Sequence, residues 1–121
     1  MVEGLSTAAA NSLLDSLGST YTWIKLHVGA PGPNGTANAS TETTRKQATW
    51  ASAASASKAT SADLLWSAVA GTEDHTHFSA WTASTAGLFG FSGVITANAV
   101  TTGDDFKIAA GGLTTSFSVA S

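Results

Sequence analysis

Apolar residues recur at helical spacing near the start of the chain. The stripe consists of Leu5, Ala9, Leu13 and Leu17, with Leu14 beside it. Ser6 stands where a helix N-cap is expected, and Gly18 stands where a left-handed C-cap is expected. The pattern predicts one short amphipathic helix. A helix of this length is marginal alone, so its stripe must dock on its own domain or on a neighbouring subunit.

From Thr20 the spacing of apolar positions changes from four to two. Ile24, Leu26 and Val28 alternate with Trp23, Lys25 and His27, as in a strand. The turn sequence APGPNG follows at residues 30–35, where Pro31 and Pro33 have no N–H to donate to a strand ladder. Residues 30–44 are therefore predicted to form a long loop without core residues. Such loops are usually functional or interfacial.

Short alternating segments, separated by Gly-containing turns, fill the rest of the chain. Further strands are predicted within residues 45–52, 62–69, 75–83, 88–95, 106–109 and 113–120. No helical crossover separates these segments, which excludes parallel βαβ units. The sequence therefore predicts a mainly β fold, an antiparallel β-sandwich or barrel of about seven short strands with one N-terminal α-helix. We expect a helix or arm over residues 1–18 and a β-sandwich domain over residues 19–121.

Charge is scarce, and this narrows the range of partners. Charged residues make up 11% of the 121 residues, the formal net charge is −3, and cysteine is absent. A protein that binds nucleic acid normally presents a basic face, so we expect no nucleic-acid partner. No run of about 18 apolar residues occurs, so we expect no membrane span. The absence of cysteine excludes disulfides and thiolate metal sites.

Three histidines are the residues most open to a chemical interpretation. His75 and His77 share one face of a predicted strand, and with His27 they could in principle bind a metal. The alternative is that they are half-buried polar residues that bond their neighbours. His27 and His77 would then form a structural pair that holds the Pro-Gly loop. We favour this alternative, and expect no metal and no cofactor.

Other features give weak support for catalysis or ligand binding. Neither a GxSxG elbow nor an HExxH motif is present, and Asp104-Asp105 follow Gly103 as expected for a solvated turn. No enzymatic function is therefore predicted. Tryptophan occurs at positions 23, 50, 66 and 81, in separate predicted strands. These side chains fit a core or a subunit interface, or, if exposed, a surface on which sugars stack.

An ordered set of short motifs spans nearly the whole chain. It comprises Leu13-Leu14, Leu26-His27-Val28-Gly29 with Pro31-Gly32, Glu42-Thr43-Thr44-Arg45-Lys46, Thr76-His77-Phe78 with Trp81, Gly90 and Gly93, and residues 103–111 (GDDFKIAAG). In this order the motifs resemble a family of small virion proteins of tailed bacteriophages, variously labelled tail-fibre, head-fibre or minor capsid proteins. One departure is Gly29-Ala30, where Ala-Asp is frequent.

The resemblance implies a structural role in the virus particle, without catalysis. We expect a capsid decoration or minor capsid (cement) protein on the outside of the head, assembled in the bacterial cytoplasm. A tail, neck or fibre component is the alternative, and a carbohydrate-binding β-sandwich module is a third interpretation. The expected partners are the major capsid protein and further copies of the chain, as a homo-oligomer. The candidate partner-binding residues, on the helix and the long loop, are Leu5, Leu13, Leu17, Pro31, Pro33, Asn34 and Arg45.

Overall fold

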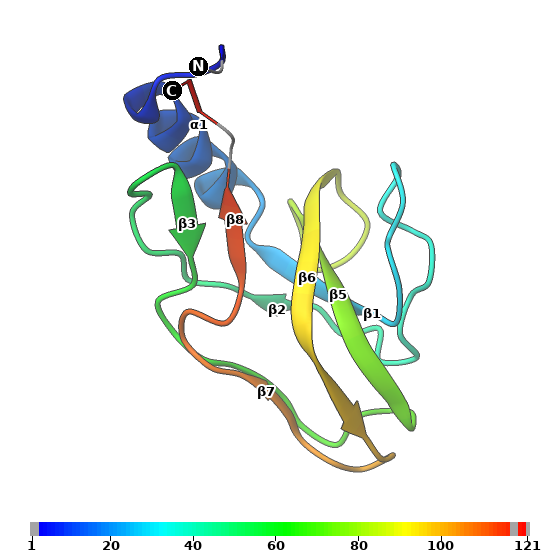
Figure 1. Cartoon of the computed structure of the whole chain (residues 1–121). Helices are drawn as coiled ribbons and strands as arrows, with labels where there is room; N and C mark the ends of the chain where they lie inside the picture. The colour runs from blue at the N-terminus through cyan, green and yellow to red at the C-terminus, as the bar shows by residue number, and fades with distance from the viewer. Residues whose placement is uncertain (1–2, 117–118, 121) are drawn as a thin grey trace.

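A computed structural model describes residues 3–116 and 119–120, with the backbone alone for residues 96–98 of one strand. It consists of one helix followed by short strands, all paired in antiparallel fashion within three sheets (Figure 1). The elements are α1 (Thr7–Thr20), β1 (Trp23–His27), β2 (Lys46–Gln47), β3 (Ser57–Ala59), β4 (Leu64–Trp66), β5 (Glu73–Trp81), β6 (Phe89–Val100), β7 (Phe106–Ile108) and β8 (Thr114–Ser116). The predicted mainly β fold with one N-terminal helix is confirmed.

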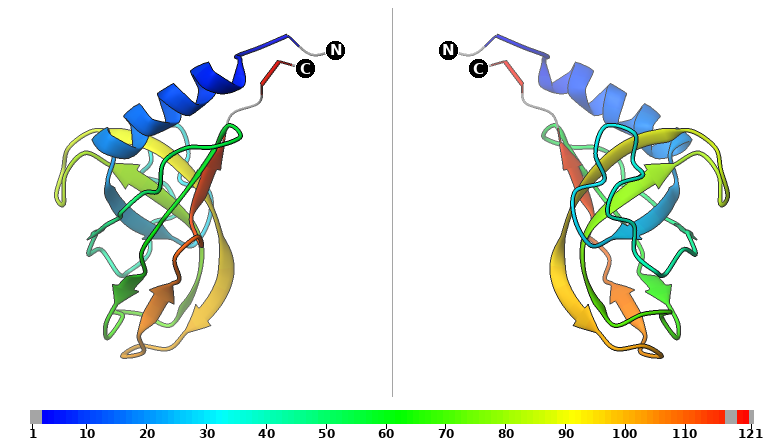
Figure 2. Two further views of the ribbon diagram at one scale, coloured as in Figure 1. Left: turned by 90° about the vertical axis from the view of Figure 1, so that its left-hand side faces the viewer. Right: turned by 90° about the vertical axis from the view of Figure 1, so that its right-hand side faces the viewer.

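A four-stranded sheet in the order β2-β1-β5-β6 forms one wall of the molecule. The pairs β4-β7 and β3-β8 stand opposite it, and helix α1 lies across one end (Figure 2). The core between these walls comprises Ile24, Leu26, Ala48, Leu64, Trp66, Val69, Phe78, Ala80, Ile95, Val100, Phe106, Ile108 and Leu113. Side chains from both walls therefore bury a single continuous apolar interior.

Helix α1 begins as predicted, but it ends later and buries a different face. The Ser6 hydroxyl accepts a hydrogen bond from the Ala9 N–H at 3.1 Å, which confirms the N-cap. Gly18 is not a C-cap, because the helix continues to Thr20 and Tyr21 caps it. The buried positions are Ala10, Leu14 and Gly18, whereas Leu13 of the predicted stripe is exposed. Lys58 of β3 packs against Gly18, so the helix docks on its own domain.

β1 and β5 bury one face in the core and part of the other face under a loop. Ile24 and Leu26 of β1 pair with Ala80 and Phe78 of β5 and point into the core. On the other face His27, Ser79 and Trp81 are also buried, because residues 28–45 fold over them. The Val28 N–H donates to the Asn38 carbonyl at 2.9 Å, and the Ser40 N–H donates to the Leu26 carbonyl at 3.1 Å.

None of the core residues named above belongs to this loop, as predicted, but parts of the loop are nevertheless buried. Pro31, Ser40 and Glu42 are buried within it. The loop is bound to the sheet by backbone and side-chain hydrogen bonds, and it covers the sheet rather than extending from it as an arm.

Strand boundaries also differ from the sequence pattern in places. β3 lies in a segment for which no strand was predicted, and the predicted strand over residues 45–52 shortens to β2. Leu64 and Trp66 are buried and Leu65 is exposed, as alternation requires. Val69 is buried as well, because the chain turns at Ala68, whose φ is 51°. Of the predicted strand over 113–120, residues 117 and 118 lie outside the described part of the chain.

Candidate functional site

His27 is the centre of a buried chain of hydrogen bonds that fixes the long loop to the sheet. Its Nδ1 lies 2.9 Å from the carbonyl oxygen of Ala37, and its Nε2 lies 2.7 Å from Ser79 Oγ. A carbonyl can only accept, so Nδ1 carries the proton and Nε2 accepts from the Ser79 hydroxyl. Ser79 Oγ in turn accepts the indole N–H of Trp81 at 2.7 Å. Both ring nitrogens of His27 are therefore already bonded.

The neutral form of His27 suits this position. Burial lowers the pKa of His27 below its ordinary value of 6.5, although the bond to the Ala37 carbonyl acts in the opposite direction. His77, opposite His27 in the strand register, bonds Thr76 Oγ1 through Nδ1 at 2.8 Å. The predicted role of His27 in holding the Pro-Gly loop is confirmed by these bonds, whereas the side-chain hydrogen bonds of His27 and His77 go to other residues.

A second buried network brings Ser40, Glu73 and His75 together. Ser40 Oγ lies 2.5 Å from Glu73 Oε1 and 3.1 Å from His75 Nε2. The carboxylate can only accept, so the single hydroxyl proton of Ser40 points at Glu73 and His75 Nε2–H donates to the serine. A nucleophilic serine must instead give its proton to the histidine. Ser40 is 3% exposed, so this trio is built to fasten the loop and not to attack a substrate.

The charges of this network follow from its contacts. Burial lowers the pKa of His75, and the nearby Glu73 carboxylate opposes that effect. For Glu73, burial raises the pKa, but hydrogen bonds from Ser40 and Thr41 outweigh it, and the pKa is lowered. His75 Nδ1 is buried without a hydrogen-bond partner, and the ring packs edge-on against Phe106 at 4.5 Å between centroids.

The histidines do not assemble into a metal centre in the part of the chain that the structure describes. Within residues 3–116 and 119–120, no group of three His, Asp or Glu side chains is placed to hold an ion. Both nitrogens of His27 are bonded, and Nε2 of His75 is bonded to Ser40. This arrangement favours structural roles for these rings.

Of the candidate partner-binding residues on the loop, some are exposed and others are used internally. Pro33 and Asn34 are exposed, whereas Pro31 is buried. Arg45 donates from Nη1 to the carbonyls of Ala83 and Ala86, at 2.9 and 2.7 Å. Its guanidinium also lies over the Trp81 ring, 4.4 Å from the centroid. Arg45 therefore clamps the turn between β5 and β6.

The candidates on helix α1 differ in the same way. Leu13 is 47% exposed, while Leu5 and Leu17 are half-buried. The Leu5 carbonyl accepts the Ala120 N–H at 2.7 Å, and Leu5 bridges Val119 in parallel, so this end of the chain is paired with the other. In Figure 1 the start of α1 and the loop over residues 30–40 lie on opposite sides of the molecule, so the two sets do not form one surface.

Further exposed apolar side chains were not singled out by the sequence pattern. Leu88 and Val94 are 70% and 69% exposed, at the start of β6 and within it. β6 is the outermost strand of the four-stranded sheet, and residues 89–100 contain no charged residue. An uncharged edge strand offers unpaired backbone groups to another chain. The alternation of apolar and polar residues along the sequence could not predict this exposure, because the exposure of β6 depends on which strands lie beside it in the sheet.

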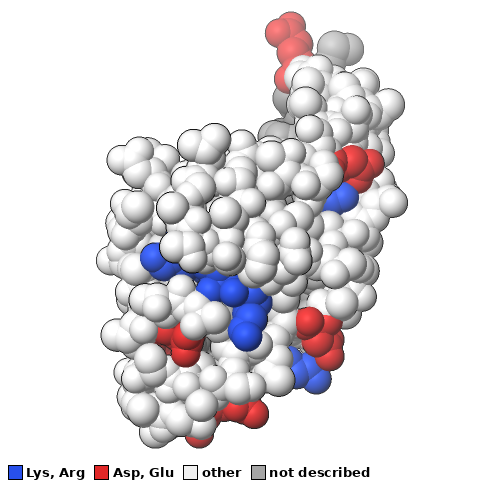
Figure 3. Space-filling view, turned by 180° about the vertical axis from the view of Figure 1, so that it is seen from behind, with Lys and Arg blue, Asp and Glu red and all other residues white. Residues whose placement is uncertain are grey.

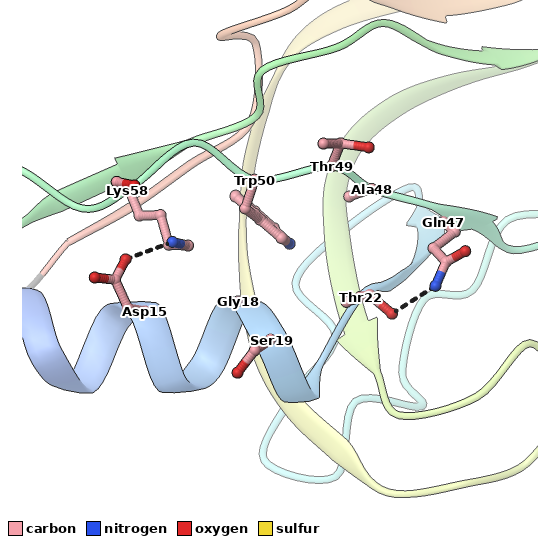
Figure 4. Close-up of a pocket in the computed structure, with 10 residues that line it drawn as sticks. Asp15, Gly18, Ser19, Thr22, Gln47, Ala48, Thr49, Trp50 and Lys58 are labelled. Carbon is pink, nitrogen blue, oxygen red and sulfur yellow. Dashed lines mark hydrogen bonds and ion pairs between the residues drawn. The ribbon is translucent and has the colours of Figure 1, made fainter.

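A polar groove lies between the C-terminal half of α1 and the segment that follows β2 (Figure 4). It has a volume of about 500 Å³ and is lined by Asp15, Gly18, Ser19, Thr22, Gln47, Ala48, Thr49, Trp50, Ser52 and Lys58. Lys58 Nζ donates to Asp15 Oδ1 and to the Ala51 carbonyl, both at 2.7 Å, so the one cation in the groove is neutralised. Sequence patterns could not predict this site, because its residues come from segments without a clear alternation of apolar and polar positions.

Charge is sparse over the outer surface as well. In the face shown in Figure 3, Lys and Arg atoms form a short central band and two smaller groups beside acidic atoms, and most of the surface is uncharged. Among the described residues no helix has the length and apolar run needed to cross a membrane.

The chain also matches a known family. The sequence profile of the family described as "Podophage GP4 fiber I protein gp80" matches residues 4–116, which leaves only short ends unmatched. No curated protein matches the chain.

Proposed function

Since the chain belongs to the podophage GP4 fiber I protein gp80 family, we propose that it is a fibre-type structural subunit of a tailed-phage virion, held in place by protein–protein contacts. The observation that carries this proposal is the family match over residues 4–116. It agrees with the resemblance found in the short sequence motifs. The internal use of His27, Ser40 and His75 in hydrogen bonds also favours a structural role over a catalytic one.

The position on the particle is a finer proposal with two candidates. The family description names a fibre and gives no location, so a fibre or tail component is the first candidate. A decoration or minor capsid protein on the head exterior, in contact with the major capsid protein, is the second. In either position we expect contacts between copies of the chain, assembly in the bacterial cytoplasm, and no nucleic-acid or membrane partner.

Counting copies per particle separates the two positions. An epitope tag inserted in the turn over residues 101–104 should leave the fold intact, because these residues are exposed and a side chain at Gly103 would meet nothing. Quantitative mass spectrometry and gold labelling of purified virions then give copy number and place. Hundreds of copies on the shell indicate the head, and a handful near the portal indicates a tail or fibre. A complete absence from purified particles would contradict both.

The contacts themselves are expected to be mainly apolar. Leu13 on α1 and Leu65 on β4 are almost equally exposed, at 47% and 46%, but only Leu13 belongs to the proposed binding set. Leu13→Glu should therefore reduce incorporation into particles, while Leu65→Glu serves as the matched control. Because charges are few, raising salt to about 1 M, where the screening length is about 3 Å, should release little protein. Release by salt alone would indicate electrostatic attachment instead.

A further inference from the structure

The groove beside Trp50 has the chemistry of a binding site for a neutral, hydroxyl-rich ligand. Its polar lining consists of hydroxyls from Ser19, Thr22, Thr49 and Ser52, the amide of Gln47 and the carboxylate of Asp15. Its volume of about 500 Å³ lies within the range of small-molecule sites. Ser19 Oγ already donates to the Ser16 carbonyl at 3.0 Å, and it keeps its lone pairs to accept a further hydrogen bond.

The electrostatics of the groove disfavour a charged ligand. Lys58 is 6% exposed and is bonded to Asp15, so it offers no free cation to an anion. The Asp15 carboxylate uses Oδ1 for both Lys58 and the Ala53 N–H, while its side chain is 50% exposed. Its second oxygen therefore faces solvent as a strong acceptor for a neutral hydroxyl donor.

Donors and acceptors are both present around the hollow. Gln47 Nε2 donates to Thr22 Oγ1 at a long 3.3 Å, and this weak bond could readily be exchanged for one to a ligand. Planar amide and carboxylate groups, together with hydroxyls that both donate and accept, match the alternating donors and acceptors of adjacent sugar hydroxyls. The groove thus offers complementary partners to a polyol on more than one side.

Trp50 supplies the apolar part of the site. Its ring is half-buried, packs against Phe91 with centroids 5.9 Å apart, and stands opposite Gly18 of α1 in Figure 4. The indole is therefore fixed in position before any ligand arrives, which lowers the entropic cost of binding. By contrast Trp66 and Trp81 are buried, at 1% and 8% exposure. An aromatic surface flanked by polar groups matches a sugar ring, which carries C–H groups on its faces and hydroxyls on its edge.

From these observations we infer that the groove between α1 and residues 47–52 binds one or two rings of a neutral saccharide. The inference goes beyond the proposed structural role and does not depend on it, because it concerns the isolated protein. The two proposals can fail separately. The protein can prove to be a virion subunit that binds no saccharide, or it can bind a saccharide and be absent from the virion.

The test is a titration of the full-length chain followed by ¹H–¹⁵N NMR. The probes are lactose, cellobiose, N,N′-diacetylchitobiose and an oligomer of rhamnose, with glucuronic acid, glucosamine and glycerol as comparisons. We expect at least one neutral saccharide to bind with a Kd of about 1 mM, equivalent to about −4 kcal/mol. The shifted amides should be those of residues 15–22 and 47–52. Titration with longer oligomers of the bound sugar shows whether the groove binds the end of a saccharide chain or an interior segment.

Variants that keep the shape of the groove complete the test. Thr49→Val removes one hydroxyl from the groove at nearly constant volume, and should weaken binding about fivefold, close to the loss of one hydrogen bond of about 1 kcal/mol. Thr114→Val, at an exposed position on β8 outside the groove, is the matched control and should bind as the original chain does. The inference is overturned if no saccharide shifts the groove, if shifts map elsewhere, if the charged sugars bind as well, or if glycerol acts equally, which would mean an adventitious additive only.

Discussion

At the residue scale, two buried histidines make stability depend on pH. Burial lowers the pKa of both His27 and His75 below 6.5, so the folded state binds protons less readily than the unfolded chain. Their contribution is complete above the unfolded pKa and is lost as pH falls through the lower folded pKa. The urea midpoint should therefore fall between about pH 7 and about pH 5.

The charged neighbours of the two rings set the background for that measurement. His27 lies near Lys25 and His77, and His75 lies near Glu42, Glu73 and Asp74. The pKa of Glu73 is itself lowered, so its contribution is lost only at more acidic pH, below its ordinary value of 4.5. The double variant His27→Gln/His75→Gln should be less stable overall but should show a flatter response above about pH 5. An unchanged slope would show that other groups dominate.

Gly18 offers a second test at the scale of one residue. In an exposed helix, Gly→Ala stabilises by about 1 kcal/mol. Here a Cβ at position 18 would overlap the Lys58 stem, whose ammonium is bonded to Asp15 and to the Ala51 carbonyl. Gly18→Ala should therefore destabilise the protein, by about 1 kcal/mol, because the lysine must give up hydrogen bonds to make room.

A double-mutant cycle with Lys58 isolates the cause of that effect. In a Lys58→Met background no ammonium anchors the end of the side chain, so it can move away from a Cβ at position 18, and Gly18→Ala should become neutral or stabilising. Chemical denaturation of the four proteins measures the coupling. If Gly18→Ala stabilises the original chain, Lys58 can move away freely and the close approach has no energetic weight.

At the scale of elements, Arg45 connects the long loop to the β5–β6 turn. One nitrogen, Nη1, donates to both the Ala83 and the Ala86 carbonyls, while the planar guanidinium lies over Trp81. Arg45→Ala should cost roughly 2 kcal/mol, as the sum of two modest hydrogen bonds and a cation–π contact. Hydrogen exchange at amides 83–88 should accelerate in step with this loss.

Arg45→Lys is the informative control for this clamp. It keeps the positive charge, but it has a shorter reach and lacks the planar guanidinium that lies over Trp81, so it should recover less than half of the lost stability. Full recovery would mean that charge alone matters at this position. Arg45 would then again be a candidate for contact with a partner protein.

The sequence pattern predicted elements well where local signals are strong, and less well where burial depends on distant segments. The Ser6 cap and the alternation of Ile24 and Leu26 are local, and both were predicted correctly. The helix face was displaced by about one position, because small residues at Ala10 and Gly18 permit close packing that a stripe of large residues does not reveal. The short strand β3 lies in a segment of Ala and Ser, where alternation carries no information.

The candidate site residues divide in the same way, into those placed by local sequence signals and those placed by contacts with distant segments. His27 could be assigned to the loop from its position before APGPNG, whereas its bond to Ser79 joins residues 52 positions apart. Arg45 was expected to face a partner, because nothing in the sequence places it beside Ala83 and Ala86. The polar side chains of Ser40, Glu42 and Lys58 are buried because each bonds backbone groups or a distant side chain, which no hydropathy pattern conveys.

At the scale of the whole molecule, the helix is the part whose independence is easiest to test. The division into residues 1–18 and 19–121 stays a prediction. Leu14 is fully buried, and Asn11 and Asp15 accept backbone N–H groups of Ala56 and Ala53. Deleting residues 1–18 would remove these contacts, expose the surface that Leu14 covers, and leave Lys58 without its carboxylate partner.

We therefore expect the shortened chain to be much less stable, with a thermal midpoint well below that of the full chain. A Lys58→Met version of the shortened chain is the control, since it removes the unpaired charge and should recover part of the loss. A shortened chain that unfolds at the original midpoint would establish the helix as a separate arm, free to bind a partner on the particle. Circular dichroism on heating measures all three proteins.

The pairing of Leu5 with Val119 and Ala120 brings the two ends of the described chain together beside α1 (Figure 2). The two ends of the described backbone therefore lie close together, with one short opening between them at a single end of the molecule. Circular permutation should be tolerated, with a short linker across that opening and new ends in the exposed turn over residues 101–104. A protein fused to either original end would be attached at the same end of the molecule, so two different fused proteins would lie next to each other. The opposite end of the molecule would stay free for contact with a surface.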